Sequence, residues 1–383
     1  MTRPRVVVGT WFTDRQPGFQ DFRQRIESLS RNYDVILVLR AERFRAEFPG
    51  LQARIVVLDT AEGRRPMLGF IRRLAGLARE IRPDLVCLLG SQLALCTFLL
   101  GRRPSALYWN EHPTHVFASS APRPGRRLIG RLLVSLSFAA ARRATMVMPI
   151  GEAHGDDLRD HGLAADRVEL VPMGVEDAFA GIRSTRAAIP TDSLGAVYAG
   201  TVSEERGRDV MIEGLARATH RGARVRLTVV GASEQELRRC TAMGERLGVA
   251  DRLQVVGRVP GSEIPGYLAR SDVGVCLWAD RIWWRFNPPT KLFEYLAAGL
   301  PVLASRIRTH TAYVRDDFNG LIFDYDAESF AAVLLRAWRE RARLPVWSDN
   351  AFREGQRFLW SKIEPRFLHS IRRALDGSVA TPR

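Results

Sequence analysis

The stretch NPPTKLFEYLAAGLPVLAS, residues 287–305, predicts a short helix that leads into a buried strand. Asn287 can cap the start of the helix, and the two prolines that follow suit its first turn, where a missing N–H costs nothing. Gly299 suits the left-handed residue that ends a helix, and the apolar run after it is typical of a strand. The stretch therefore predicts one helix–strand unit of an α/β fold.

The polar side chains of this predicted helix share one face near its positive end. At about 100° per residue, Thr290, Lys291 and Glu294 lie together, opposite an apolar face. Of the 57 basic residues 55 are arginine, and only Lys291 and Lys362 are lysine. A lysine kept at a helix N-terminus indicates a place that needs a compact ammonium. The alternative is a surface lysine whose partner is Glu294.

The composition describes a globular protein with a strong positive charge. The chain has 383 residues, 46% of them hydrophobic, which favours two domains with buried cores. The net charge of +15 indicates an anionic partner, which could be nucleic acid, a membrane surface or a phosphorylated substrate. The four cysteines are scattered without metal-type spacing, so core packing in a reducing compartment is favoured over disulfides or zinc.

Three features bear on localisation, which we predict to be cytoplasmic. The N-terminus runs into a predicted strand without the apolar region and cleavage site of a signal peptide. The uncharged run 85–101 is shorter than the roughly 20 residues that cross a bilayer, and it predicts a buried strand, a turn and a buried helix. The basic, apolar-rich stretch 123–143 leaves two alternatives: a helix on anionic lipid at the inner face of the plasma membrane, or a core helix with solvated arginines.

Strand-like runs alternate with helical segments in two blocks, which predicts an α/β protein with two Rossmann-like, doubly wound domains facing a cleft. The expected strands are 6–8, 35–39, 54–58, 85–89, 106–109, 146–150 and 169–172, then 196–199, 226–230, 253–256, 273–277 and 301–304. The expected divisions are a first domain at 1–175, a polar linker at 176–193, a second domain at 194–346, and a C-terminal region at 347–383. Its helix, about 350–375, is expected to pack back on the first domain.

Four segments of the second domain, in this order, resemble the retaining group 1 glycosyltransferases of family 4, which have the GT-B fold. They are a glycine-rich loop at 199–207, a strand ending in glycine at 227–231, a base-binding segment at 253–273, and the helix that carries Lys291 and Glu294. The resemblance implies transfer of a sugar from a nucleotide-diphosphate-sugar to an acceptor hydroxyl with retention. It makes the first domain the acceptor domain.

The resemblance also implies the site residues. The catalytic candidates are His112, in a segment after a first-domain strand, and Arg206 and Lys291, which would stabilise the departing diphosphate. The expected contacts of the nucleotide-sugar are Gly9, Gly200, Thr201, Gly231, Gly257, Arg258, Val259, Asn287, Pro289, Thr290, Leu292 and Glu294. The alternatives are a structural histidine, a tight turn with a solvated arginine, and a capping carboxylate. No metal ion or other cofactor is expected, because no Asp-x-Asp motif follows an early strand.

The chain departs from the family pattern at three places. Thr201 stands where the family usually has arginine, Arg206 where it has lysine, and Phe286 where it has an acidic residue eight positions before Glu294. The run 283–286, Trp-Trp-Arg-Phe, could offer an aromatic wall to the sugar or acceptor, or pack in the core. These departures leave the donor sugar and its contacts undetermined.

The sequence leaves three functions to compare. The first is a glycosyltransferase that uses a glycan or lipid-linked acceptor in bacterial cell-envelope polysaccharide or glycolipid synthesis. The second is a nucleotide-sugar epimerase or hydrolase of the same fold, and the third is a non-catalytic polyanion-binding protein. Nucleic acid is not the expected partner, because the arginines are spread along the chain and no nucleic-acid motif is present.

Overall fold

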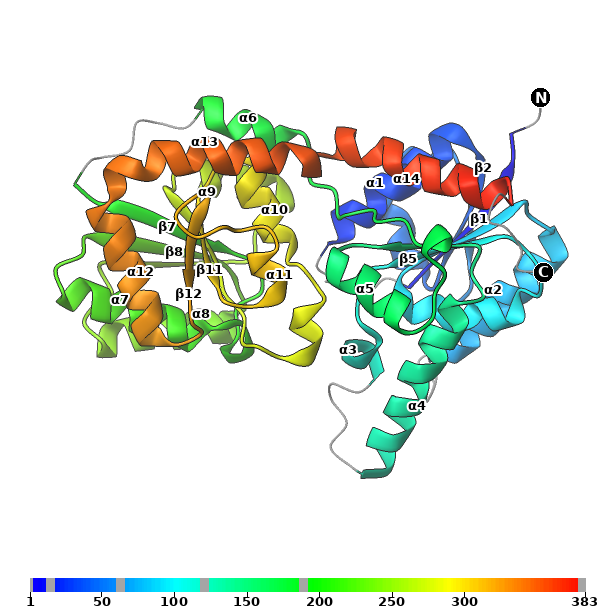
Figure 1. Cartoon of the computed structure of the whole chain (residues 1–383), viewed down its shortest axis with the longest axis horizontal. Coiled ribbons are helices and arrows are strands. Elements are labelled where there is room, and N and C mark those ends of the chain that lie inside the picture. Colours follow the sequence, from blue (N-terminus) through cyan, green and yellow to red (C-terminus); the bar gives the residue numbers. More distant parts are fainter. Residues whose placement is uncertain (1–2, 12–17, 60–65, 118–123, 186–191, 378–383) are drawn as a thin grey trace. The chain divides into compact units, whose positions relative to one another are not determined.

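The computed structural model describes residues 3–11, 18–59, 66–117, 124–185 and 192–377, which group into two compact units. The first unit combines 1–174 with 361–383, and the second unit is 175–360. Each unit is built around one parallel sheet with helices on both faces (Figure 1). The prediction of two Rossmann-like, doubly wound domains is confirmed.

The sheet of the first unit has the strand order β3-β2-β1-β4-β5-β6, so the order reverses between β1 and β4. Its strands are β1 (Arg5–Thr10), β2 (Asp34–Leu39), β3 (Arg54–Val57), β4 (Leu85–Leu89), β5 (Ser105–Trp109) and β6 (Met146–Pro149). The α-helices are α1 (Phe19–Asn32), α2 (Pro66–Ile81), α3 (Pro113–Phe117), α4 (Pro124–Ala141), α5 (Glu152–Asp160) and most of α14 (Trp360–Leu375). Short 3-10 helices are η1 (Glu42–Glu47), η2 (Ser91–Leu99) and η3 (Ala165–Arg167).

The second sheet has the order β12-β11-β10-β7-β8-β9, with the reversal between β7 and β10. Its strands are β7 (Leu194–Ala199), β8 (Val225–Ala232), β9 (Leu253–Gly257), β10 (Val273–Cys276), β11 (Val302–Ser305) and β12 (Gly320–Phe323). The α-helices are α6 (Ala178–Thr185), α7 (Arg208–His220), α8 (Glu234–Arg246), α9 (Ile264–Ala269), α10 (Thr290–Ala297), α11 (Arg308–Thr311), α12 (Ala327–Arg339) and α13 (Leu344–Gly355). Short 3-10 helices are η4 (Glu204–Arg206), η5 (Gly261–Glu263), η6 (Ile282–Arg285), η7 (Arg341–Arg343) and η8 (Gln356–Phe358).

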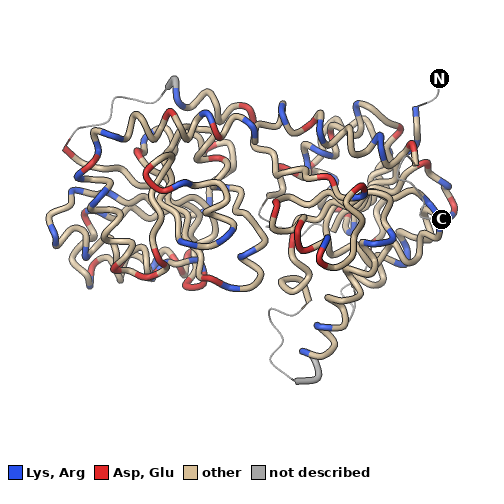
Figure 2. Tube along the Cα trace, viewed as in Figure 1, with Lys and Arg blue, Asp and Glu red and all other residues tan. Residues whose placement is uncertain are grey.

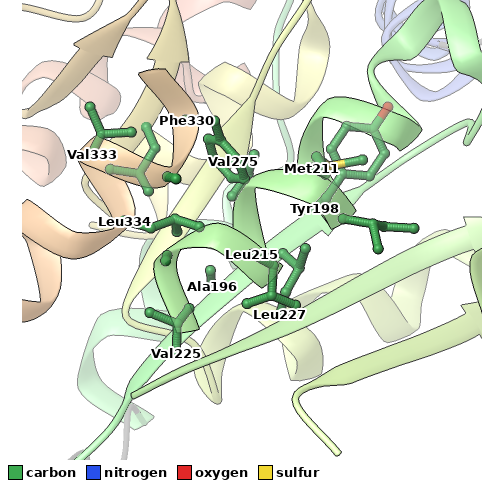
Figure 3. Close-up of a cluster of buried hydrophobic side chains, with 14 of the residues drawn as sticks. Ala196, Tyr198, Met211, Leu215, Val225, Leu227, Val275, Phe330, Val333 and Leu334 are labelled. Carbon is green, nitrogen blue, oxygen red and sulfur yellow. The ribbon is translucent and has the colours of Figure 1, made fainter. Parts of the chain in front are cut away.

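The core of the second unit lies between its sheet and the helices α7 and α12. Ala196, Leu227 and Val275 from three strands meet Leu215 of α7 and Phe330 of α12, and all five side chains are buried (Figure 3). These positions are apolar on strands covered on both faces, as parallel sheets require. This packing holds the carboxyl ends of β7, β8 and β10 in fixed positions.

Two strand predictions differ from the structure. Residues 169–172 form no strand: the N–H groups of Glu169 and Val171 donate to β6, but Pro149 of β6 has no N–H to return. Strand β12, Gly320–Phe323, was not expected, since four residues after a turn carry little signal. It completes the second sheet by pairing with β11.

The C-terminal region also differs from the expected single helix. The helical path is broken at Leu359, whose backbone is extended and which bridges Val175, where the chain leaves the first unit. After the break, α14 packs on the first unit, where Glu364 pairs with Arg31 at 2.6 Å. The stretch expected to be an irregular linker contains the helix α6.

The run 85–101 forms β4, a turn at Gly90 and the 3-10 helix η2, rather than β4 and an α-helix. Among the helices in the described ranges, none has both the length and the apolar character needed to cross a bilayer.

Candidate functional site

The side chain of Lys291, in the first turn of α10, lies at the switch point of the second sheet, where the strand order reverses between β7 and β10. Its Nζ lies 3.4 Å from the ring centroid of Tyr198, near the end of β7. A Cβ atom on Gly200 would lie 3.0 Å from the same Nζ, so glycine leaves the space that the ammonium occupies. Ligands of doubly wound sheets bind at this kind of reversal.

The N-cap of helix α10 lies two residues later than expected. The N-cap position is Pro289 rather than Asn287, because Asn287 is buried and its N–H approaches the carbonyl oxygen of Trp283. The end of the helix is as expected: Gly299 has φ of +72°, and the N–H of Leu300 donates to the carbonyl oxygen of Tyr295. Lys291 therefore stands in the first turn, where the helix dipole is positive.

Lys291 is a buried cation without a compensating anion. Its side chain is 8% exposed, and no hydrogen bond or ion pair to Nζ is present among the described residues. Burial is the largest influence and, with the positive charge of Arg206, lowers the pKa of Lys291 to about 7. The Cys276 thiol beneath it is also buried, which raises its pKa to about 12 and keeps it protonated. An arriving anion would restore the charged form of Lys291.

Glu294 stands one turn further along α10 and is half-buried. Burial raises its pKa to about 7, Lys291 acts to lower it, and Glu176 acts to raise it. A carboxylate here accepts hydrogen bonds from neutral donors such as ribose hydroxyls. Lys291 and Glu294 thus place an ammonium and a hydrogen-bond acceptor on one helix face, as the sequence predicts, while the rest of the helix is buried nearly all round.

The ends of β7 and β8 approach each other through two glycines. Gly200 has φ of +135° and Gly231 has φ of +109°, conformations that side chains strongly disfavour. A Cβ on Gly231 would lie 2.4 Å from the carbonyl oxygen of Gly200. Thr201, next in the loop, is exposed, and its carbonyl oxygen accepts a hydrogen bond from the Tyr198 hydroxyl. Backbone therefore forms this edge of the site, open to close approach by a ligand.

Arg206 ends the loop that follows β7. The N-cap hydroxyl of Ser203 accepts a hydrogen bond from the Arg206 backbone N–H, and Gly207 reverses the chain with φ of +81°. The guanidinium carbon lies 5.0 Å from the ring centroid of Trp284 and 5.5 Å from that of Trp278. Lys291 and Arg206 are close enough to lower the proton affinity of the lysine, so the structure brings both predicted cations to one place.

The remaining second-unit candidates lie along the same edge. Gly257 ends β9 and pairs with Ala232 of β8, Arg258 is exposed, and Val259 is half-buried. Pro289 is buried before α10, and Leu292 is fully buried in the first turn of the helix. The backbone at 257–259 is the part of this group open to solvent.

The first-unit candidates lie at the end of its own sheet. Gly9 is inside β1, and a Cβ there would be 2.5 Å from Leu74 of α2, so packing by itself explains the glycine. His112 follows β5 and is buried. Its Nδ1 accepts the N–H of Thr114, and its Nε2 lies 3.2 Å from a carboxylate oxygen of Asp157 on α5. Both ring nitrogens therefore have partners within the unit. Most of the loop after Trp11 lies outside the described residues.

Three residues near the cations were not anticipated from the sequence. Tyr198 supports Lys291, the Tyr295 hydroxyl accepts the N–H of Ala199 at 2.8 Å and joins α10 to β7, and Trp278 contacts Arg206. Only Trp278 had a recognisable signal, an aromatic residue directly after a predicted strand. The run 283–286 contributes the buried Trp284 to a cluster with Trp278 and Ile307.

Comparisons with known proteins agree with this architecture. The family described as glycosyl transferases group 1 matches residues 194–340, and the glycosyl transferase 4-like domain matches residues 21–174. Together the two matches cover the whole second sheet and every strand of the first sheet except β1.

Individual relatives are distant. A D-inositol 3-phosphate glycosyltransferase of Acidothermus cellulolyticus is 29% identical over 268 residues, 66% of this chain and 57% of the relative. A putative colanic acid biosynthesis glycosyltransferase of Salmonella typhimurium is 25% identical over 195 residues, 50% of this chain and 47% of the relative. The chain thus spans little more than half the length of the curated relatives it matches. Anabaena HepE, solved with UDP-glucose, superposes with a TM-score of 0.75 at 15% identity, covering 96% of this chain and 99% of HepE.

Proposed function

The chain belongs to the glycosyltransferases of group 1, with the GT-B fold, and we propose that it transfers a sugar from a nucleoside diphosphate sugar to an acceptor hydroxyl with retention. The observation that carries this proposal is the pair of cations at the switch point of the second sheet. Lys291 and Arg206 lie beside a backbone edge made by two glycines, and neither has a carboxylate ion-pair partner among the described residues. A diphosphate supplies the missing negative charge.

In the proposed reaction the bond between the anomeric carbon and the diphosphate oxygen breaks, while the acceptor oxygen bonds to the same face of that carbon. The acceptor proton passes to the departing diphosphate, whose growing charge Lys291 and Arg206 stabilise. Glu294 would accept hydrogen bonds from the ribose, the backbone at 257–259 would border the base, and His112 would contact the donor from the first unit. Asp157 opposite Nε2 would fix the orientation of the His112 ring.

The acceptor is proposed from the relatives. Several matching proteins are named D-inositol 3-phosphate glycosyltransferases, which makes this cyclitol phosphate the first acceptor to test. A match named for colanic acid biosynthesis supports a place in bacterial cell-envelope glycan or glycolipid synthesis.

The test is a product assay with UDP-, GDP- and ADP-sugars, each with and without D-inositol 3-phosphate. A glycosylated acceptor that forms only with both substrates supports transfer, and the anomeric coupling constant of the product reports retention. Sugar conversion or release without acceptor, at the rate seen with it, would favour the epimerase or hydrolase. Lys291→Met and Glu294→Gln must both reduce turnover, because a polyanion-binding protein has no need of Glu294.

We propose further that α4 of the first unit binds anionic membrane. Leu128, Leu132 and Leu136 form a stripe along α4, and Ile129 lies beside them; these side chains are 37–70% exposed. In Figure 1 the N-terminal part of α4 extends away from the sheet of its own unit, and Figure 2 shows basic residues on it. Arg127 and Arg131 of α4 are exposed. Exposed apolar side chains flanked by arginine match a surface of anionic lipid. Arg123 lies outside the described residues.

Vesicle co-sedimentation tests this membrane proposal. Phosphatidylglycerol vesicles should retain the protein at low salt, while phosphatidylcholine vesicles should not. Leu132→Glu, which places a negative charge in the middle of the apolar stripe, should abolish binding. A protein that ignores anionic vesicles at low salt would refute the assignment.

A further inference from the structure

The guanidinium of Arg206 contacts a pair of indole rings. The rings of Trp278 and Trp284 stack with centroids 4.3 Å apart and planes 26° apart. The Arg206 guanidinium carbon is about equally distant from both rings, at 5.5 and 5.0 Å. All three groups therefore contact one another, at a separation where the electron-rich faces of indole attract a cation.

Carboxylates do not hold Arg206, although they hold its neighbours. Arg208, two residues on, bonds Asp209 at 2.6 Å and Glu236 at 2.7 Å. Arg285, in the segment that carries Trp284, bonds Asp280 at 2.6 Å. Within the part of the chain that the structure describes, Arg206 has no such ion pair. Its charge is therefore not neutralised by the protein.

The indole pair is itself fixed to the sheet. The Ser305 hydroxyl, at the end of β11, accepts the N–H of Trp278 and donates to its carbonyl oxygen, both at 2.9 Å. The Thr309 hydroxyl donates to the carbonyl oxygen of Trp284 at 2.6 Å. Both indoles are 4–5% exposed and pack with Ile307. A buried surface anchored in this way can orient a flexible arginine side chain.

We propose that Trp278 and Trp284 are positioning residues for Arg206. The indole pair restricts the guanidinium to one orientation and leaves its charge and its N–H donors for the donor diphosphate, whereas a carboxylate partner would consume both. The proposal rests on the proposed function, since Arg206 must bind the diphosphate. It also explains how Arg206 alone can bind the diphosphate from the loop after β7, where Thr201 stands in place of the arginine that the family usually has.

A double-mutant cycle on UDP affinity tests this coupling. Calorimetry would measure Kd for the wild type, Trp284→Leu, Arg206→Ala and the double variant. We expect Trp284→Leu to weaken UDP binding about 3- to 30-fold, the range that a desolvated cation–π contact supports. In the Arg206→Ala background the same substitution should change Kd by less than about twofold, because its effect acts through Arg206.

Matched variants separate positioning from general damage. Trp338→Leu removes another tryptophan of the second unit that contacts an arginine, Arg341, at 4.0 Å, and it should leave Kd unchanged. Trp284→Phe keeps a ring and should recover most of the affinity lost in Trp284→Leu, and Trp278→Phe should behave likewise. Thermal unfolding of each variant confirms that the comparison is made on folded protein.

The outcomes distinguish the two proposals. If Arg206→Ala leaves Kd for UDP unchanged, the diphosphate role of Arg206 fails, and the positioning role fails with it. If Arg206→Ala weakens binding but Trp284→Leu and Trp284→Phe do not, only the positioning role is overturned. It is also overturned if Trp284→Leu weakens binding as much in the Arg206→Ala background as in the wild type.

Discussion

Replacing Lys291 by methionine should stabilise the unliganded protein and weaken UDP binding at least about 30-fold. Lys291 is 8% exposed as a residue, its Nζ is buried and has no hydrogen-bond partner among the described residues, and Nζ lies against the face of Tyr198. Methionine keeps a long flexible chain in the same space without the charge. Lys291 therefore lowers the stability of the empty protein, a cost consistent with the ligand-binding role that we propose for it.

The pKa of Lys291 sets the size of this cost. The pKa falls from 10.5 to about 7 on folding, and one unit is worth 1.36 kcal/mol. At pH 7 the folded protein therefore loses up to about 4 kcal/mol relative to an unperturbed lysine. This is a ceiling, because a flexible side chain relaxes toward water. If Lys291→Met recovers a quarter of this penalty, about 1 kcal/mol, the melting temperature of the second unit should rise by about 2–4 °C.

The pH dependence identifies the cause. Because the pKa of Lys291 is depressed in the folded state, the unfolded chain binds more protons between pH 7 and 10.5, so this group's penalty shrinks as pH rises. The penalty is at most about 5 kcal/mol at pH 6 and about 2 kcal/mol at pH 9. The stabilisation by Lys291→Met should therefore be larger at pH 6 than at pH 9.

The assay is calorimetric unfolding of both proteins at pH 6, 7.5 and 9, with UDP titrations at pH 7.5. The affinity for UDP should fall at least about 30-fold, as expected when a buried ionic contact loses one partner. Lys362→Met is the matched control: it removes the other lysine, which is exposed on α14, and should change neither property. The reasoning is refuted if Lys291→Met destabilises the empty protein, or if its stability difference grows with pH.

Three further perturbations test other parts of the site. At pH 7.5, UDP binding should be accompanied by uptake of about half a proton. Lys291 would gain roughly three quarters of a proton and Glu294 would lose roughly one quarter, since both groups have a pKa of about 7. Calorimetric titration in buffers of different ionisation enthalpy measures this uptake, and no uptake would contradict the assignment. Gly231→Ala should lower the free energy of unfolding by about 3 kcal/mol or more and prevent UDP binding, because the new Cβ would lie 2.4 Å from the Gly200 carbonyl oxygen. The control is Gly222→Ala, which is also at positive φ but has open space around it. It should lower the free energy of unfolding, measured by urea denaturation, by only about 1 kcal/mol. Asp157→Asn should lower turnover with UDP affinity unchanged, and an equal loss of UDP affinity would argue against its action through His112.

Hydrophobic runs predicted most of the fold, because a strand buried on both faces must be apolar along its length. Such runs located eleven of the twelve strands of the two sheets, β1 to β11, within a few residues; β12 was missed. The apolar runs could not show which segments pair by backbone hydrogen bonds, because that pairing depends on N–H groups of other segments. Residues 169–172 form no ladder with β6 because Pro149 has no N–H to donate. Leu359 is extended rather than helical, and it forms a β-bridge with Val175.

The site divides in a similar way. Lys291, Glu294 and Gly299 were predicted with their positions on one helix, since helix geometry relates residues a few positions apart. The groups that set their chemistry come from distant segments: Tyr198 from β7 and Cys276 from β10 lie beside Lys291. Burial produces the shifted pKa, and burial is a property of the packed fold rather than of the local sequence.

Local geometry gives each of the two cations its residue type. At position 291 the available space lies above Gly200 and the Tyr198 ring, and Nζ reaches within 3.0 Å of where a Gly200 Cβ would stand. A compact ammonium fits this place, and a planar guanidinium with five donors would exceed it. At position 206 the guanidinium carbon lies 5.0 and 5.5 Å from the centroids of two indole rings, within the range of a cation–π contact, for which arginine is suited. A chain that uses arginine for nearly all its basic residues therefore has a lysine at position 291, where the space is narrow, and an arginine at position 206, where two indole rings are available to orient it.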